Sequence, residues 1–185
     1  MNRRLFLGYK IPRKIIDTIL MARTTLGDKQ KFYNWVSGNN LHLTLLFLGS
    51  IDQLDNDKLF DDINTVISEY NDFSISINGT GTFGNENQIL WLGIDRGKDK
   101  LKEINYELQV QLGKTLKQPT KTKFIPHITI ARKKKTEIGN NIDVKNFMNS
   151  VYFPIEFHIK FFTLFESRNI NGRVHYKRIE KFNLI

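Results

Sequence analysis

Residues 41–49 read LHLTLLFLG and residues 124–132 read FIPHITIAR. Both stretches contain the same pattern, in which an apolar residue precedes a histidine, a second apolar residue and a threonine. Apolar residues that alternate with polar ones are typical of a half-buried β-strand. We therefore predict strands over residues 41–48 and 125–131, each with a histidine and a threonine at the same relative positions.

The spacing within each pattern decides where the polar side chains point. Residues i and i+2 of a strand lie on the same face, about 6.6 Å apart along it. His42 and Thr44 are therefore expected side by side on one surface, as are His127 and Thr129. A single histidine in a strand is more often a hydrogen-bonded structural residue than a catalytic one. Two matching copies instead indicate an approximate internal duplication, which would bring all four side chains to one cleft.

This set of side chains suits in-line displacement at phosphorus. A neutral histidine can remove a proton from the attacking oxygen, and a protonated one can donate to the leaving oxygen. The unperturbed imidazole pKa of about 6.5 allows either role, and threonine hydroxyls can donate hydrogen bonds to the non-bridging oxygens. The sequence has no clustered carboxylates and no HExxH-type spacing, so we predict a reaction without a metal or other cofactor. The residues alone do not separate the acid from the base.

The rest of the chain mixes strands and helices. Alternating patterns predict further strands over residues 3–9, 32–36, 73–77, 89–94, 155–165 and 173–182. Apolar residues at helical spacing predict helices over residues 12–27, 55–70, 98–116 and 144–148. The glycine-rich residues 79–84 are interpreted as a loop or bulge, and residues 169–172 as a hairpin turn. This order, with several antiparallel pairs expected, predicts an α+β fold in a single domain over residues 1–185.

The chain is strongly basic, with a formal net charge of +9 at pH 7 and a pI of about 9.7. A basic surplus attracts polyanions and speeds their encounter with the protein. Much of the surplus falls in one region, at Lys114, Lys117, Lys121, Lys123, Arg132, Lys133, Lys134 and Lys135. We interpret this region as a candidate footprint for a phosphate backbone. The alternative is a solvated loop whose charges flank a strand.

Cysteine usage and hydropathy bear on location. The chain has no cysteine, so it has no disulfide framework and no thiolate metal site. No apolar run approaches the roughly 20 residues needed to cross a bilayer. The basic residues Arg3 and Arg4 are not followed by the apolar segment of a signal peptide. We expect a cytoplasmic protein that does not bind a membrane.

The two quoted stretches resemble the paired signature motifs of the two-histidine (HxTx) phosphoesterase superfamily. Within it, the chain resembles the bacterial and archaeal RNA 2′,3′-cyclic phosphodiesterases, also called 2′-5′ RNA ligases. The resemblance spans nearly the whole chain and includes residues 4–8, 35–36, 91–93 and 164–168. It implies a bilobal fold whose two pseudo-symmetric lobes each contain a mainly antiparallel sheet flanked by helices, with the active-site cleft between them.

The resemblance also implies an activity and a role for each motif residue. The expected reaction hydrolyses a terminal 2′,3′-cyclic phosphate of RNA to a 2′-phosphomonoester. His42 would be the proton donor that expels the 3′-oxygen, and His127 the proton acceptor that activates water. Thr44 and Thr129 would bind the phosphate. Attack by the 5′-hydroxyl of a second RNA would instead give a 2′-5′ linkage. We expect a monomer, because the cleft of this family needs no partner chain.

Other residues could contribute to the cleft or merely to the fold. Arg132 could hold a phosphate through a two-pronged hydrogen bond, or it could be a solvated charge at a strand end. Phe6 is a candidate for stacking on a terminal base, although aromatic residues in strands more often belong to the core. His158 and His175 are interpreted as non-catalytic. Leu46 departs from the family, in which this position is often basic.

Two other interpretations of the same cleft stay open. A binding module could hold RNA there without turnover, with tight, salt-sensitive binding that His42→Ala would leave intact. An enzyme of the same class could instead act on a small substrate, such as ADP-ribose 1″,2″-cyclic phosphate or a 2′-5′ oligoadenylate. Both histidines and both threonines are present, which favours an enzyme, and the basic surplus favours a longer polyanion.

Overall fold

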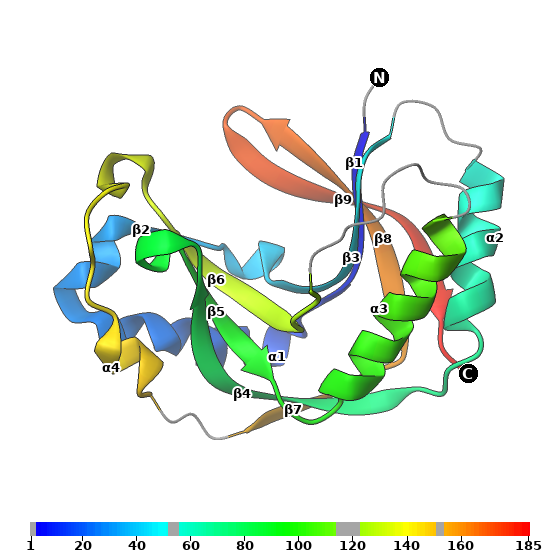
Figure 1. The fold of residues 1–185 in the computed structure, drawn as a ribbon, viewed down its shortest axis with the longest axis horizontal. Coiled ribbons are helices and arrows are strands. Elements are labelled where there is room, and N and C mark those ends of the chain that lie inside the picture. Colours follow the sequence, from blue (N-terminus) through cyan, green and yellow to red (C-terminus); the bar gives the residue numbers. More distant parts are fainter. Residues whose placement is uncertain (1–2, 52–55, 114–122, 151–153) are drawn as a thin grey trace.

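The structure is a computed structural model that describes residues 3–51, 56–113, 123–150 and 154–185 (Figure 1). Its strands are β1 (Arg3–Lys10), β2 (Tyr33–Trp35), β3 (His42–Ile51), β4 (Phe73–Phe83), β5 (Ile89–Ile94), β6 (His127–Lys133), β7 (Ile155–Ile159), β8 (Phe161–Ile170) and β9 (Arg173–Asn183). Its α-helices are α1 (Arg13–Leu20), α2 (Asn56–Ile67), α3 (Lys98–Gly113) and α4 (Lys145–Met148). Segments of 3₁₀ helix cover Met21–Phe32, Gly38–Asn40, Asn85–Asn87 and Lys135–Glu137.

The strands form one hydrogen-bonded sheet in the order β7-β4-β5-β6-β3-β1-β8-β9, with β2 paired to β6. Every strand pairing among the described residues is antiparallel, and helices flank the sheet, so the predicted α+β class is confirmed. One half of the sheet contains β1, β3, β8 and β9, and the other contains β2 and β4 to β7. The two halves meet through a single register pair, Leu43 opposite Ile128. Helices α2 and α3 pack on each other beside the first half, and α4 lies at the far end of the second (Figure 1).

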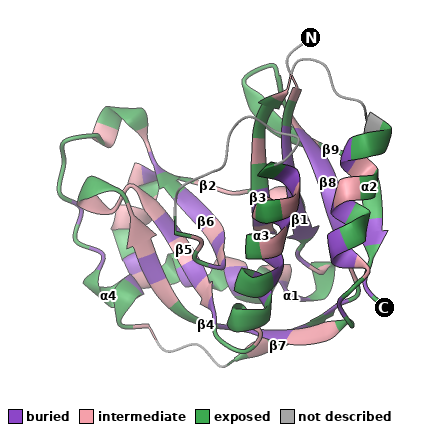
Figure 2. Ribbon diagram, turned by 45° about the vertical axis from the view of Figure 1, so that its right-hand side comes forward, coloured by how far each residue is buried: buried purple, intermediate pink, exposed green. Residues whose placement is uncertain are grey.

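Alternation of side chains along the strands separates a core from an accessible face. In Figure 2, buried residues alternate with half-buried ones along β5 and along β6 as far as Ile130. Leu43, Leu45, Ile128 and Ile130 are all fully buried, which is the inward orientation that the sequence pattern predicts for the residues between the motif polar positions. The apolar partners thus fix which face of β3 and β6 the histidines occupy.

Most predicted elements differ from the observed ones by a few residues at their ends, and three differ by more. Residues 79–83 belong to β4, and the register of its pairing with β5 shifts between Ile77 and Thr80. Of the two interpretations of this stretch, the bulge is confirmed and the loop is wrong. The predicted strand over 155–165 is interrupted at Lys160, because β7 pairs with β4 while β8 pairs with β1 and β9 in the other half. The predicted helix over 12–27 ends at Leu20 and continues as 3₁₀ helix.

Two short turns depend on backbone conformations that favour glycine. The predicted hairpin between β8 and β9 is confirmed: Asn171 and Gly172 form its tip with φ of 51° and 76°, as a two-residue hairpin turn requires. Gly81 on β4 lies under the indole of Trp91, and a Cβ there would come within 2.0 Å of a ring atom. Glycine at this position is therefore what lets Trp91 lie flat against the neighbouring strand.

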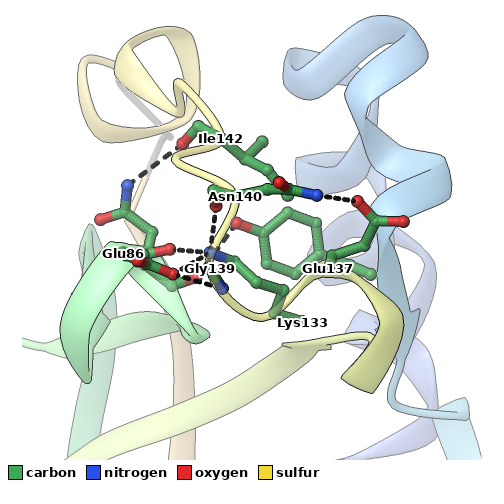
Figure 3. Close-up of polar contacts among 8 residues, drawn as sticks. Glu86, Lys133, Glu137, Gly139, Asn140 and Ile142 are labelled. Carbon is green, nitrogen blue, oxygen red and sulfur yellow. Dashed lines mark hydrogen bonds and ion pairs between the residues drawn. The ribbon is translucent and has the colours of Figure 1, made fainter.

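A buried lysine ties two loops to the end of β6 (Figure 3). The side chain of Lys133 is only 1% exposed. Its ammonium donates hydrogen bonds to the carbonyl oxygens of Glu86 and Asn140, the latter at 2.9 Å, and lies 3.7 Å from the Glu86 carboxylate. That carboxylate also accepts from the backbone N–H of Gly139 at 2.9 Å. A buried charge is tolerated only with partners of this kind.

No helix within the described ranges is both long and apolar enough to cross a membrane.

The Lys133 cluster predicts a large effect of an uncharged substitution. Lys133→Met should lower the free energy of unfolding by about 3 kcal/mol, because two carbonyl acceptors and a carboxylate lose their donor inside the protein. Urea unfolding followed by circular dichroism measures the change. Lys135→Met, at an exposed position, is the matched control and should change the midpoint little. Equal effects of the two substitutions would contradict the structural role of Lys133.

Candidate active site

The two motif strands lie next to each other and run in opposite directions. Counting outward from the Leu43–Ile128 pair places His42 across from Thr129, and His127 across from Thr44. All four polar side chains are half-buried, while the residues between them are buried. The structure therefore brings the two predicted pairs together on one face, as the repeated pattern indicates.

Both imidazole rings are oriented by the same local hydrogen bond. The Nδ1–H of His42 donates to the carbonyl of Asn40 at 2.7 Å, and the Nδ1–H of His127 donates to the carbonyl of Ile125, also at 2.7 Å. A carbonyl oxygen can only accept, so Nδ1 carries the proton in each ring. Each Nε2 is then left with a lone pair and can take up or, once protonated, release a proton.

Aromatic neighbours hold each ring in place. The His42 ring has Phe6 and the edge of Tyr176 each at 4.9 Å between centroids. The His127 ring has Phe83 at 4.8 Å, edge-on, and Trp91 at 6.0 Å. Aromatic contacts of this geometry restrict ring rotation. Both histidines are therefore held both by a backbone hydrogen bond and by packing.

Phe6 does not offer a free face for a base. Its side chain is 3% exposed, and its ring stacks on Phe165 at 5.2 Å with Tyr176 edge-on at 5.0 Å. The sequence-based candidacy of Phe6 for base stacking is wrong in this respect, because both faces of β1 are covered. Phe6 instead packs behind His42 and supports the ring.

Burial lowers the pKa of both histidines. Desolvation is the largest cause in each case, and the hydrogen bonds to the Asn40 and Ile125 carbonyls oppose it. The positive charge of Arg132 lowers the pKa of both rings further, and the charge of His127 adds to this effect at His42. The unliganded cleft therefore favours two neutral imidazoles at neutral pH.

The threonine hydroxyls are available to a ligand. Neither Thr44 nor Thr129 has a hydrogen-bond partner for its hydroxyl within the part of the chain that the structure describes. Each lies on the accessible face beside a histidine. A hydroxyl in this position can donate a hydrogen bond to an anionic oxygen placed between the two strands.

A bulge in β6 directs Arg132 toward the cleft. Between the pairs Trp91–Thr129 and Leu90–Ala131, strand β6 contains one extra residue, Ile130. The extra residue shifts the alternation, so Arg132 lies on the face of Thr129 instead of the core face. The charge of the exposed Arg132 guanidinium reaches both histidines, whose pKa it lowers, and Tyr176, where it partly offsets the rise in pKa that burial causes. Its place suits an anion held between the histidines.

The predicted basic footprint is not one surface. Arg132 is exposed but Lys133 is buried, so these two neighbouring cations lie on opposite faces of β6. The footprint as predicted is wrong for Lys133. Its members Lys114, Lys117 and Lys121 lie outside the described residues.

The other histidines lie outside the paired motifs. His158 bonds Asp72 at 3.1 Å and Ser74 at 2.9 Å on the exposed face of β7, and His175 is exposed on β9. No group of three or more His, Cys, Asp or Glu side chains that could hold a metal occurs among the residues the structure describes.

Hollows adjoin the motif residues on both sides. A pocket of about 180 Å³ is lined by Thr44 and His127 together with Asn105, Gln109 and the largely buried Leu46, among others. A smaller one of about 90 Å³ adjoins His42 and is lined by Phe6, Lys10, Asn39, Asn40, Leu41, Phe165, Tyr176 and Arg178. The motif face thus opens to space on each side of the histidine pair.

Sequence reasoning missed Tyr176 and Phe83, the aromatic residues that contact the two histidines. Tyr176 lies on β9, which β1 and β8 separate from β3 in the sheet, yet its ring contacts His42. Phe83 lies in the glycine-rich stretch, whose strand character the sequence does not show. No local pattern could identify either residue, since both contacts depend on long-range strand order.

Comparisons with known proteins agree with the fold and with the family that the sequence resembles. The sequence model of the 2′-5′ RNA ligase superfamily matches residues 12–171. The RNA 2′,3′-cyclic phosphodiesterase of Bacillus subtilis is 31% identical over 183 residues, which cover 97% of this chain and 95% of that protein. The protein of the same name from Thermotoga maritima is 33% identical over 105 residues, 54% of each chain. The crystal structure of apo LigT from E. coli shares the fold, with a TM-score of 0.78, 22% identity, and coverage of 99% of this chain and 98% of LigT.

The electrostatics of the cleft predict a measurable coupling. Arg132→Gln should raise the pKa of both His42 and His127, because it removes a positive charge that disfavours their protonated forms. NMR titration of the imidazole nitrogens gives both values. Lys135→Gln removes the same charge from an exposed 3₁₀ segment and is the control. Unchanged histidine pKa values in Arg132→Gln would show that the guanidinium does not face the cleft.

Proposed function

The chain belongs to the 2′-5′ RNA ligase superfamily, and on this premise we propose that it is a metal-independent RNA 2′,3′-cyclic 3′-phosphodiesterase. The observation that carries the proposal is the pair of imidazoles on adjacent antiparallel strands, each with Nδ1–H held by a carbonyl and Nε2 left open. The relative that aligns with nearly the whole chain and the one that aligns with about half of it are both named RNA 2′,3′-cyclic phosphodiesterase.

In the proposed reaction, water attacks the cyclic phosphorus while the 3′-oxygen leaves on the opposite side. Nε2 of His127 takes the proton of the water as the new P–O bond forms. Nε2–H of His42 gives a proton to the 3′-oxygen as the P–O3′ bond breaks, which leaves a 3′-hydroxyl and a 2′-phosphomonoester. Thr44, Thr129 and Arg132 hold the non-bridging oxygens as their negative charge increases.

Because the pKa values of both histidines are lowered, the substrate itself helps to protonate one of them. The free cleft favours two neutral rings, whereas the reaction needs one protonated ring. A bound phosphate places a negative charge beside both, which favours protonation of one of them. The acid is thus formed as the anion binds. The assignment of this role to His42 comes from the family, since the two rings have equivalent hydrogen bonds.

The same geometry can accept a different nucleophile. If the 5′-hydroxyl of a second RNA replaces water, His127 removes its proton and the product is a 2′-5′ linkage. The superfamily takes its name from this ligation. We propose it as a secondary, reversible activity of the same site. We further propose that the protein acts as a cytoplasmic monomer, a view supported by the origin of both motifs in one chain.

The proposal predicts the outcome of a direct assay. A short RNA that ends in a 2′,3′-cyclic phosphate should be converted to a 2′-phosphate in the presence of EDTA. His42→Ala and His127→Ala should each lower kcat about a thousandfold, because each removes one proton-transfer group. His158→Ala is the matched control and should retain activity. RNA that is bound but never cleaved by the wild type would instead identify a binding module.

The pH dependence provides an independent check. The acid is lost as pH rises through its lowered pKa, so kcat/KM should peak on the acid side of about pH 6.5. In the complex the phosphate raises the pKa of the donor, so the basic limb of kcat should lie at higher pH than that of kcat/KM. Profiles measured with a cyclic mononucleotide show both limbs. Coincident basic limbs would rule out protonation assisted by the substrate.

A further inference from the structure

A larger hollow continues from the active-site pocket. It has a volume of about 550 Å³, and it shares the lining residues Lys123, Phe124 and Ile125 with the pocket beside His127. The two spaces therefore adjoin along one segment of chain. A volume of this size is within the range of small-molecule and nucleotide sites, which begin at roughly 300 Å³.

One face of helix α3 lines both spaces. Lys98 and Lys102 line the larger hollow, and Asn105 and Gln109 line the pocket beside His127. Their spacing of four, three and four residues places all of them on the same side of the helix. From the first to the last, this side extends about 17 Å along the helix axis. This side of α3, which is exposed at Lys98 and Lys102 and buried at Asn105, thus borders a groove that leads away from the histidines.

The groove has the chemistry of a single-stranded nucleic-acid site. Three lysines line its outer part, and Asp95 is the only carboxylate among the described residues that line it. Lys98 pairs with Asp95 at 3.4 Å and Lys102 with Asp99 at 3.1 Å, but all four side chains are exposed. Exposed pairs of this kind are weak and screened by salt, so phosphates can replace the carboxylates.

Apolar and aromatic surface accompanies the charges. Trp91 and Phe124 line the outer hollow, and the neighbouring Ile125 is 40% exposed. Lysines that track a backbone, with aromatic rings beside them, are the usual means of binding unpaired strands. The pocket beside His42 also has two cations, but its volume of about 90 Å³ is too small for a nucleotide.

We propose that the RNA strand on the 5′ side of the terminal nucleotide lies along this α3 groove, with its phosphates paired to Lys98 and Lys102. The proposal rests on the proposed function and specifies its substrate: a single-stranded RNA end, in preference to a free cyclic mononucleotide. The cyclic phosphate lies at the histidines, and the preceding nucleotides extend over residues 123–125 toward the N-terminal end of α3.

The test compares two substrates, a short single-stranded RNA with a 2′,3′-cyclic phosphate and a 2′,3′-cyclic mononucleotide. The double substitution Lys98→Gln and Lys102→Gln should lower the ratio of their kcat/KM values about 20-fold, since two phosphate contacts are lost. It should also reduce the dependence of log KM for RNA on log salt by about 1.4 in slope. Lys100→Gln, on the same helix, is the control. Its ammonium lies over the Tyr70 ring at 4.9 Å and pairs with Glu103 at 3.2 Å, so the ratio should not change.

Binding of a fluorescent RNA with a 2′-phosphate end, followed by anisotropy, separates this proposal from the proposed function. Loss of affinity in the double variant but not in Lys100→Gln supports the groove, even if the wild type cleaves neither substrate, in which case the proposed activity alone fails. An unchanged substrate ratio and unchanged RNA affinity in the double variant would overturn the groove. A lowered ratio in Lys10→Gln or Arg178→Gln, with none in the double variant, would overturn it too and place the strand beside His42.

Discussion

The pairing of Leu43 with Ile128 is the constraint on which the rest of this structure depends. It is the only register pair between β3 and β6 among the described residues, and both side chains are fully buried. An antiparallel pair has a local twofold axis, so identical motifs on the two strands become equivalent about it. If one strand slipped by one residue, its own histidine would move into the core and lose its position beside the other. The same pairing therefore joins the two halves of the sheet and sets the arrangement of the site.

The carbonyls that precede the two strands complete this equivalence and shape the chemistry. Asn40 and Ile125 each accept from the imidazole two residues later, which opposes the loss of charge that burial causes but does not overcome it. Two neutral bases on one face are a poor catalyst by themselves, because a displacement at phosphorus also needs an acid. An anion between them changes this balance. The cleft is thus adapted to a negatively charged substrate through its proton affinity as well as through its hydrogen-bond donors.

The parts of the fold and site that the sequence predicts correctly are those set by local alternation. The two motif strands, the α+β class and the hairpin at Asn171–Gly172 follow from period-two patterns and turn residues. Tyr176 and Phe83 could not be found, because their contacts depend on the order of strands distant in sequence. Lys133 could not be distinguished from its basic neighbours, since a run of cations looks solvated until the partners in other loops are known.

The bulge at Ile130 shows why basic composition alone is weak evidence for a binding surface. In a regular strand, Arg132 would share the core face of Ile128 and Ile130, and Lys133 would face the cleft. The extra residue in β6 exchanges them: Arg132 gains access to the histidines, and Lys133 becomes the internal tie for two loops. The bulge in the backbone therefore decides which cations of this strand can contact a polyanion. Their clustering in the sequence does not. By the same argument, two lysines one turn apart on α3, in an unremarkable helical sequence, contribute more to a phosphate path than the lysine buried beside Arg132.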